Sequence, residues 1–405
     1  MDAEIRNPGA DELDAVVATV ETSWGYHAGP EEREDARALA DLGRTWVAFE
    51  GTAPVGVAAA LAFELTMPGG AAVAVSGLTE VGVLPTHRRR GLLSALMARH
   101  LDDCRARGEV ASVLIASEAA IYPRFGYGPA VTAQSATIDP RRAAFAPTAP
   151  GQSGRMTLLG PEDAAAVVPA VYDAYRRSQP GEVSRSPAYW DVLLRDRERW
   201  RDGAGPRFVA AHEGGGGFDG YAFYRVKAGW PLGLPAFEMS VEEVVATTAE
   251  ARAALWRYLL GVDLVVSLDA WSLPTDEPLR SMLADPRALG VTAVRDLLWA
   301  RLCDVGAALA SRAYGGPGAA LVLDVTGEGR LRLDAGPGGA ECRPAPAAVA
   351  DLSVAAADLA AAWLGATSWT VLARAGRAVE HTAGAVERAA RLFATDPPPH
   401  SVTDF

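Results

Sequence analysis

Residues 77–93 read Gly-Leu-Thr-Glu-Val-Gly-Val-Leu-Pro-Thr-His-Arg-Arg-Arg-Gly-Leu-Leu, which is the most informative pattern in the sequence. Its first part, up to Val83, predicts a strand. Apolar residues then recur at helical spacing and predict a helix, with one face formed by Leu92, Leu93, Leu96, Met97 and Leu101. Between the two stands a loop of three arginines and one glycine. The sequence therefore predicts a strand that runs directly into a helix through a basic turn.

The basic turn predicts an anion-binding site. A helix N-terminus presents unpaired backbone N–H groups and the positive end of the helix dipole, which together can hold a diphosphate. Arg88 to Arg90 add charge-assisted contacts, and Gly91 lets the backbone approach the ligand. The backbone of Val81 and Val83 can bind an extended amide as a neighbouring strand would. Coenzyme A carries both a diphosphate and a peptide-like arm, whereas a solvated basic turn is the alternative interpretation.

Other nucleotide-binding and catalytic motifs are missing from the sequence. Lys227 is the only lysine, so no G-x-x-x-x-G-K-[ST] loop exists, and no G-x-G-x-x-G follows the strand. There is also no G-x-S-x-G elbow and no H-E-x-x-H zinc motif. The three cysteines, at positions 104, 303 and 342, have no metal-ligand spacing, so we expect no bound metal.

The order of predicted elements repeats along the chain. Strand, helix, hairpin, strand, helix and strand follow one another over residues 3–116, and again over residues 155–268, which predicts a structural duplication. After these, a helix is expected over Leu297–Ala313, then paired strands and two alanine-rich helices. This last part is an α+β module. At the start of the second copy's helix, residues 248–256 contain no glycine and an early acid, so this copy is not expected to bind a diphosphate.

Composition narrows the class of protein. The 405 residues exceed what one core usually supports, and 49% of them are hydrophobic, so two or three globular domains are expected. No apolar run reaches the roughly 18 residues of a membrane span, and the start lacks a secretory signal, so we expect a cytoplasmic protein with no membrane partner. A net charge of −12 argues against nucleic acid and favours small cationic partners.

Two motifs carry a resemblance to a known family. Residues 85–93, Pro-Thr-His-Arg-Arg-Arg-Gly-Leu-Leu, and residues 117–130, Ser-Glu-Ala-Ala-Ile-Tyr-Pro-Arg-Phe-Gly-Tyr-Gly-Pro-Ala, resemble the enhanced intracellular survival (Eis) family of GCN5-related N-acetyltransferases (GNAT). The resemblance extends over the whole chain. It implies an α/β (α+β) fold with tandem GNAT domains, the second degenerate, and a domain like sterol carrier proteins. The expected ranges are 1–147, 153–295 and 297–405.

The resemblance also implies an activity and its residues. It implies acetyl transfer from acetyl-CoA to amines, with Tyr122 as general acid and the α-carboxylate of Phe405 as general base. Tyr127 is the rival acid, although the motif favours Tyr122. The residues implied to contact acetyl-CoA are Val81, Val83, Arg88, Arg89, Arg90, Gly91, Leu92, Leu93, Ser94, Ser117 and Glu118. The amine pocket would contain Trp24, Tyr26 and Asp404, with Tyr26 standing where relatives have an aspartate.

Partners follow from the same resemblance. It implies a homohexamer that acetylates aminoglycosides or other small-molecule amines. Two other functions stay open at this point: a non-catalytic acyl-CoA-binding regulatory protein, and a protein-lysine acetyltransferase. Release of free thiol from acetyl-CoA in the presence of amines distinguishes the first, and comparison of peptide and aminoglycoside rates distinguishes the second.

Overall fold

The computed structural model describes residues 3–151 and 153–405. Met1 and Asp2, in the first expected domain, and Gln152, in the expected linker, lie outside the described residues. The chain forms two compact units. Unit 1 comprises Met1–Val131, Leu297–Pro399 and Thr403–Phe405, and unit 2 comprises Thr132–Asp296 and His400–Val402.

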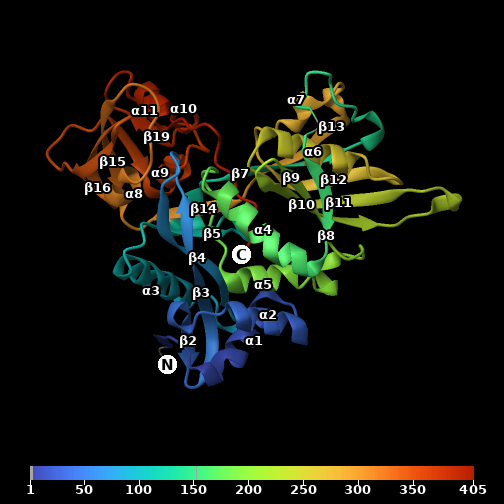
Figure 1. Cartoon of the computed structure of the whole chain (residues 1–405). Helices are drawn as coiled ribbons and strands as arrows, with labels where there is room; N and C mark the ends of the chain where they lie inside the picture. The colour runs from blue at the N-terminus through green and yellow to red at the C-terminus, as the bar shows by residue number, and fades with distance from the viewer. Residues whose placement is uncertain (1–2, 152) are drawn as a thin grey trace. The chain divides into compact units, whose positions relative to one another are not determined.

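Unit 1 contains a seven-stranded sheet, sheet A, in the order β1-β2-β3-β4-β5-β14-β6. Figure 1 labels its strands β2, β3, β4, β5 and β14. Its strands are β1 (Glu4–Arg6), β2 (Trp46–Glu50), β3 (Ala53–Thr66), β4 (Ala72–Val83), β5 (Ala111–Ile115), β6 (Gly128–Pro129) and β14 (Leu298–Leu302). Neighbouring strands are antiparallel except for β4 and β5, which are parallel. This one parallel pair is the expected strand–helix–strand unit around the basic turn.

Helices cover both faces of sheet A, because successive residues of its strands point to opposite faces and both sets are apolar. On one face, α3 (Leu92–Ala106) buries Leu96, Met97 and Leu101 against residues such as Ala48 and Val55. The other face carries α1 (Leu13–Trp24), whose apolar side chains pack with those of β2 and β3, forming a cluster of Val16, Val20, Val47, Phe49 and Val57. A further helix, α2 (Pro30–Leu39), precedes β2.

Unit 2 repeats the arrangement in sheet B, whose order is β13-β7-β12-β11-β10-β9-β8. The strands are β7 (Thr132–Ile138), β8 (Arg155–Leu159), β9 (Phe208–Gly214), β10 (Gly217–Lys227), β11 (Phe237–Ala246), β12 (Val265–Leu273) and β13 (Leu289–Asp296). Here β11 and β12 are the parallel pair. One face is covered by α6 (Ala249–Leu260), and the other by α4 (Pro161–Arg176) and α5 (Pro187–Leu194). The duplication predicted from element order is therefore present.

The two sheets exchange one strand each. β14, which follows the second sheet in sequence, lies between β5 and β6 of sheet A. β7, which follows the first sheet in sequence, lies between β12 and β13 of sheet B. The linear ranges 1–147, 153–295 and 297–405 do not describe this exchange, because each sheet needs a strand from beyond its own range.

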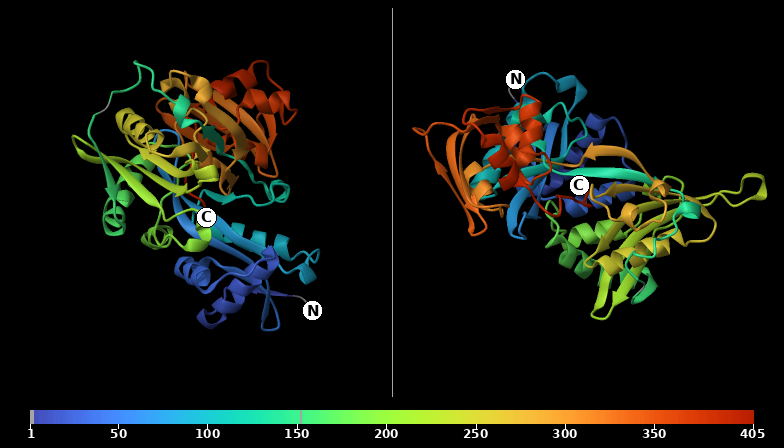
Figure 2. Two further views of the ribbon diagram at one scale, coloured as in Figure 1. Left: turned by 90° about the vertical axis from the view of Figure 1, so that its right-hand side faces the viewer. Right: turned by 90° about the horizontal axis from the view of Figure 1, so that it is seen from above.

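The third sheet belongs to unit 1 and has the order β17-β16-β15-β18-β19. Its strands are β15 (Ala319–Thr326), β16 (Gly329–Gly336), β17 (Gly339–Pro344), β18 (Leu352–Ala355) and β19 (Ala378–Glu380). Four short helices accompany it: α8 (Val305–Ala310), α9 (Ala356–Trp363), α10 (Trp369–Arg374) and α11 (Ala385–Phe393). Figure 2 shows these helices, in orange and red, gathered beside the orange strands. The expected α+β module is therefore present.

One predicted helix is wrong. In place of a single helix over Leu297–Ala313, the structure has the strand β14, a turn and the short helix α8. Leu298, Trp299 and Ala300 are all buried, since β14 is a central strand covered on both faces. A short run that is apolar on both faces has no alternation, so periodicity alone does not separate it from a buried helix.

Within the described part of the chain, no helix is both long enough and apolar enough to cross a membrane.

Candidate functional site

The site begins where the two parallel strands of sheet A separate. β4 and β5 pair at Val75 with Ala111, at Ser76 with Ser112 and at Gly77 with Val113. Beyond that point β4 runs on to Val83 beside β3, while β5 stays paired with β14 on its other side. We call this opening between the strand ends the first fork. An extended ligand can enter it and meet the exposed backbone edge of a strand.

A cavity of about 770 Å³ lies at the carboxyl ends of these strands. It is built from the end of α1, the end of β4, the basic turn with the first residues of α3, and the segment after β5. Nine of the eleven residues expected to contact acetyl-CoA line it: Val81, Val83, Arg88, Arg89, Gly91, Leu93, Ser94, Ser117 and Glu118. Trp24 and Tyr122 line it as well.

The three arginines of the basic turn have different surroundings. Arg90 forms an ion pair with Glu50 at 2.9 Å, and His87 contacts the same carboxylate at 3.1 Å. Hydrogen bonds from His87 and Arg90 lower the pKa of Glu50 to about 2. Among the residues that the structure describes, no ion pair or hydrogen bond engages the guanidinium of Arg89. Arg89 is therefore the arginine whose charge is available to an anion in the cavity.

Gly91 gives the start of α3 an open approach. It is the N-cap of the helix and has a φ of 81°, the left-handed region that favours glycine. An added β-carbon there would meet nothing within 4 Å, and no side chain caps the start of α3. Leu92 points into the core instead and is 9% exposed, so only its backbone is available to a ligand.

The backbone carbonyls at the end of β4, which the sequence predicted to be open to a ligand, already accept hydrogen bonds from side chains. The carbonyl of Val81 accepts a hydrogen bond from the indole N–H of Trp24 at 3.0 Å. Arg88 donates to the carbonyl of Val83 at 3.4 Å and to that of Ser23 at 3.1 Å. These carbonyls are therefore not free, although a carbonyl oxygen has a second lone pair for a ligand amide.

Close packing of α1 on β4 positions Trp24 at the cavity. A β-carbon on Gly82 would lie 1.9 Å from the hydroxyl oxygen of Ser23, so only glycine lets the end of the helix approach the strand this closely. Trp24 is 50% exposed, and its ring lies 6.3 Å from that of Tyr26. Tyr26 itself is not among the residues that line the cavity. The two rings form an aromatic surface beside the cavity.

The two candidate tyrosines differ in access. Tyr122 opens a short 3-10 helix after β5, is 6% exposed and lines the cavity. Burial, followed by the nearby charge of Glu118, raises the pKa of Tyr122, so its hydroxyl is protonated at neutral pH. Tyr127 is fully buried, and its hydroxyl donates to Ser112 at 2.7 Å. Burial also raises the pKa of Tyr127 far above its usual value, but its hydroxyl proton is already donated to Ser112 inside the core.

The end of the chain lies where β4 and β5 part. The ring of Phe405 packs on Phe63 of β3, with centroids 4.7 Å apart. A β-carbon on Gly77, the last β4 residue paired with β5, would be 3.0 Å from the Phe405 ring. Asp404 is exposed, and neither Asp404 nor Phe405 lines the cavity itself.

Sequence reasoning missed several residues of this region. Ser23, Ile121 and Arg124 line the cavity, and Arg124 brings another cation to it. Glu80 sits in the irregularity of β4 just before Val81, with a positive φ of 51°. Burial raises the pKa of the Glu80 carboxyl. The basic character of Arg124 within the second motif is the one signal that could have revealed it.

The corresponding region of sheet B is built otherwise. β11 and β12 pair as far as Val241 and Ala270, and we call the opening beyond that point the second fork. At the start of α6 the hydroxyl of Thr248 accepts the N–H of Ala251 at 3.1 Å, so a side chain caps the helix. The following arginine, Arg252, is paired with the buried carboxylate of Glu277. The anion-binding features of the first fork are therefore absent from these residues.

Three family models match the chain. Two models of the GNAT acetyltransferase domain match residues 4–130 and 181–302, and a model of the sterol carrier protein domain matches residues 305–402. The N-acetyltransferase Eis of Mycobacterium bovis is 34% identical over 414 residues, covering 100% of both chains. The chain belongs to the Eis family of N-acetyltransferases.

Other acetyltransferases and solved structures are similar as well. An N-acetyltransferase from Streptomyces avermitilis is 38% identical over 377 residues, which cover 92% of this chain and 91% of the relative. The crystal structure of Eis1 from Mycobacterium abscessus has a TM-score of 0.86 at 34% identity and covers 100% of both chains. A GCN5-related N-acetyltransferase from Anabaena variabilis shares the fold, with a TM-score of 0.85 at 18% identity. The chain is therefore an acetyltransferase enzyme, and enzymes of this type take acetyl-CoA as co-substrate.

Proposed function

We propose that the chain transfers the acetyl group of acetyl-CoA to small-molecule amines at the first fork. The observation that carries the proposal is the single cavity lined by the start of α3, the end of β4 and Tyr122. Arg89 and the N–H groups after Gly91 hold the diphosphate, and the backbone of Val81 and Val83 meets the pantetheine arm. The thioester then points toward the segment after β5, which carries Tyr122.

The residues divide the proton transfers between them. As the amine nitrogen bonds to the acetyl carbon, the carbon–sulfur bond breaks and leaves a thiolate, to which Tyr122 donates its hydroxyl proton. The α-carboxylate of Phe405 accepts the proton of the amine through a relaying water, so that an amide and a free thiol are formed. A terminal carboxyl has a reference pKa of about 3.3–3.7 and is ionised at neutral pH. Each of these transfers contributes typically 10²–10⁴-fold to the rate.

Substrate recognition is proposed to involve Trp24, Tyr26 and Asp404. The adjoining rings of Trp24 and Tyr26 offer a surface for a cationic amine, worth roughly 0.5–2 kcal/mol in a cation–π contact. Asp404 adds a carboxylate beside the chain end. This combination suits aminoglycoside-like polyamines, which carry several cationic amino groups.

The proposal extends to assembly and location. We propose a homohexamer in the cytoplasm, by analogy with the family. Exposed apolar side chains in unit 2 support self-association, because such surface is usually covered in assemblies: Trp230, Leu232 and Leu234 are all exposed in the loop between β10 and β11. Light scattering that shows only a monomer would remove this part of the proposal.

A matched pair of tyrosine variants tests the chemistry. Tyr122→Phe should lower kcat about 100-fold with little change in KM, because the hydroxyl matters mainly as thiolate charge develops. Tyr127→Phe loses a hydroxyl of the same kind within the core and should stay within about 3-fold of the parent kcat. The measurement is thiol release from acetyl-CoA with a panel of amines. A larger loss for Tyr127→Phe would show that the acid is assigned to the wrong residue.

The same assay separates the two other functions. A non-catalytic acyl-CoA-binding protein would bind acetyl-CoA in calorimetry and release no thiol with any amine. A protein-lysine acetyltransferase would work faster on lysine-containing peptides than on aminoglycosides. Product mass then identifies the acetylated amine.

A further inference from the structure

A buried polar network in unit 2 holds the residues just before Thr403. His400, Ser401 and Val402 are all buried. The carboxylate of Glu182 accepts a hydrogen bond from the hydroxyl of Ser401 at 2.9 Å and from the N–H of Val402 at 2.7 Å. Arg185 donates to the carbonyl of Val402 at 3.2 Å. Both residues come from the segment between α4 and α5, and they hold the tail by its backbone as well as by a side chain.

Other buried groups fix these two residues in turn. The hydroxyl of Tyr172 on α4 donates to Glu182 at 2.8 Å. Arg185 forms an ion pair with Glu243 on β11 at 2.9 Å, and Tyr221 of β10 donates to the same Glu243. Burying charges is costly unless partners compensate, so the network is weak evidence of stabilisation, and its hydrogen bonds instead fix the orientation of Glu182 and Arg185.

The held residues lie at the second fork. The carbonyl of Ser401 accepts from the hydroxyl of Ser272, which follows the last paired residue of β12 by two positions. Glu243, the partner of Arg185, follows the last paired residue of β11 by two positions. Val402 joins the apolar cluster between sheet B and helices α4 and α5. The second fork therefore receives the chain's own tail.

We infer that Glu182 and Arg185 are positioning residues that fix the tail and thereby set where the Phe405 carboxylate can lie. The inference rests on the proposed role of that carboxylate as the base. Phe405 is three residues beyond Val402, and a chain spans at most about 3.3–3.6 Å per residue, so fixing Val402 confines the carboxylate to a radius of roughly 10 Å. Orientation of this kind raises the effective concentration of a reacting group.

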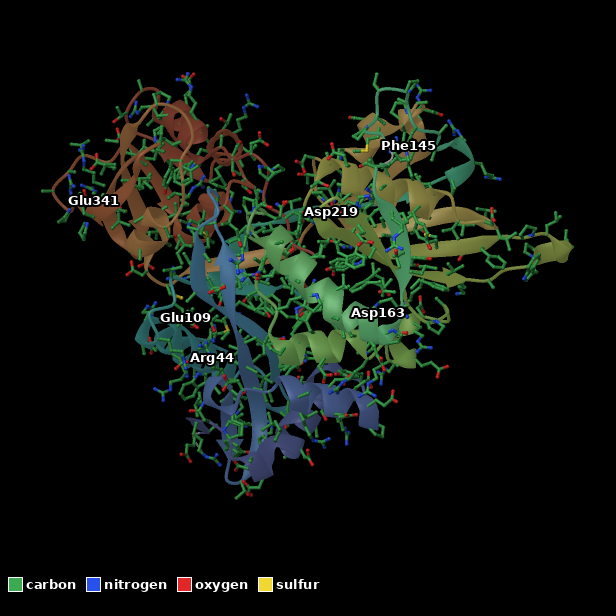
Figure 3. The ribbon with its side chains drawn as sticks, viewed as in Figure 1. Arg44, Glu109, Phe145, Asp163, Asp219 and Glu341 are labelled. Carbon is green, nitrogen blue, oxygen red and sulfur yellow. The ribbon has the colours of Figure 1, made fainter. Side chains whose placement is uncertain are left out.

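Glu182→Gln tests the inference, with Glu109→Gln as matched control. Glu109 is also a buried carboxylate, but its partner is Arg44 at 2.6 Å and it does not hold the tail; the pair is labelled in Figure 3. Two quantities are measured on the full chain: kcat with a chosen amine, and the rate at which a carboxypeptidase specific for aromatic residues removes Phe405, followed by intact mass. Calorimetry gives the affinity for acetyl-CoA.

For Glu182→Gln we expect removal of Phe405 at least about 10-fold faster and a kcat about 10- to 100-fold lower, with acetyl-CoA affinity within about 2-fold. Glu109→Gln should change neither rate. Glu182→Asp, which keeps the charge, should recover part of the kcat. If Glu182→Gln does not fold, Ser401→Ala removes only one bond of the network and should change both rates in the same direction.

A tail that stays protected in both Glu182→Gln and Ser401→Ala overturns the positioning role and leaves the base assignment standing. A released tail with an unchanged kcat overturns the positioning role together with the base assignment, because the carboxylate would then be dispensable. The two proposals therefore fail in distinguishable ways.

Discussion

The two forks occupy the same place in sheets of the same strand order, yet they hold different things. The first fork ends in a basic turn with an open helix start, where a β-carbon on Gly91 would meet nothing. At the second fork, Thr248 caps the helix with its own hydroxyl, and the tail residues Ser401 and Val402 are bound at the strand ends. In addition, the indole of Trp271 on β12 donates to the carbonyl of Glu242 on β11 at 3.1 Å.

A duplicated binding site can stop binding its ligand and still keep a structural role. An open strand edge and an uncapped helix start leave backbone groups unsatisfied, and these groups must bind either a ligand or the protein itself. In our proposal the first fork leaves the N–H groups at the start of α3 for acetyl-CoA, while Trp24 and Arg88 donate to the carbonyls of Val81 and Val83. The second fork satisfies them with side chains and with the chain's own tail.

Changing the end of that tail should reduce activity more than any other change proposed below. Extending the chain beyond Phe405 converts the α-carboxylate into an amide carbonyl and moves the new charge outward, so kcat should fall at least about 100-fold. Acetyl-CoA affinity should be nearly unchanged, because the tail does not line the cavity. The rate of thiol release from acetyl-CoA is measured on extended protein that mass spectrometry shows to be uncleaved. A protein with an N-terminal tag is the control and should keep its activity.

Glu80 is the alternative candidate for the general base that this first experiment tests. It lies in β4 beside Val81, and burial raises its pKa, which would suit a base. If the tail carboxylate is the base, Glu80→Gln should keep kcat within about 3-fold of the parent value. Full activity in the extended protein together with a large loss in Glu80→Gln would transfer the role of base to Glu80.

The next prediction compares the affinity for acetyl-CoA after substitutions at the starts of α3 and α6. Arg89→Ala combined with Gly91→Asp removes an unpaired cation and puts a carboxylate at the open helix start, so acetyl-CoA should bind at least about 10-fold more weakly. The site of the new side chain is empty, but the φ of 81° at Gly91 strains any other residue, so circular dichroism checks that the fold survives. Glu250→Ala, in the first turn of α6, should leave the affinity unchanged. Calorimetric titration decides, and equal affinities for all three proteins would place the cofactor elsewhere.

The smallest effect concerns His400, which the second fork buries. Neither ring nitrogen has a hydrogen-bond partner among the described residues, and burial, aided by the charge of Arg252, lowers the pKa of His400 to about 3. The unfolded chain takes up a proton near pH 6.5 while the folded chain does not. The free energy of unfolding should therefore decrease as the pH is lowered below about 6.5, by up to about 1.4 kcal/mol for each pH unit.

His400→Leu removes this contribution. Between pH 7.5 and pH 5 the variant should lose about 2 kcal/mol less of its unfolding free energy than the parent, as read from urea denaturation at both pH values. Identical pH dependence in the two proteins would show that His400 is not held neutral in the folded state.

Local patterns predicted most elements, because the relevant signals are local. The strand to Val83, the basic turn and the helix from Leu92 all appear where the sequence placed them. The motif residues around Tyr122 also meet the basic turn in one cavity. The strand exchange and the hold of Glu182 on Ser401 were not predictable, since both join positions far apart in sequence and no periodicity encodes such a pairing. The hydrogen bonds of Arg88 and Trp24 and the ion pair of Arg90 were not predictable either, because their partners are far away in sequence.

The exchange of β7 and β14 sets an order of events for a chain emerging from the ribosome. β5 and β6 are synthesised early, but β14, which lies between them, follows the whole of sheet B. Until then their facing edges present unpaired backbone groups, and such edges invite wrong pairing. β7 waits in the same way for β12 and β13. Sheet A therefore stays incomplete until β14 is made, so a nascent chain that stalls before residue 298 should remain a substrate for chaperones and proteases.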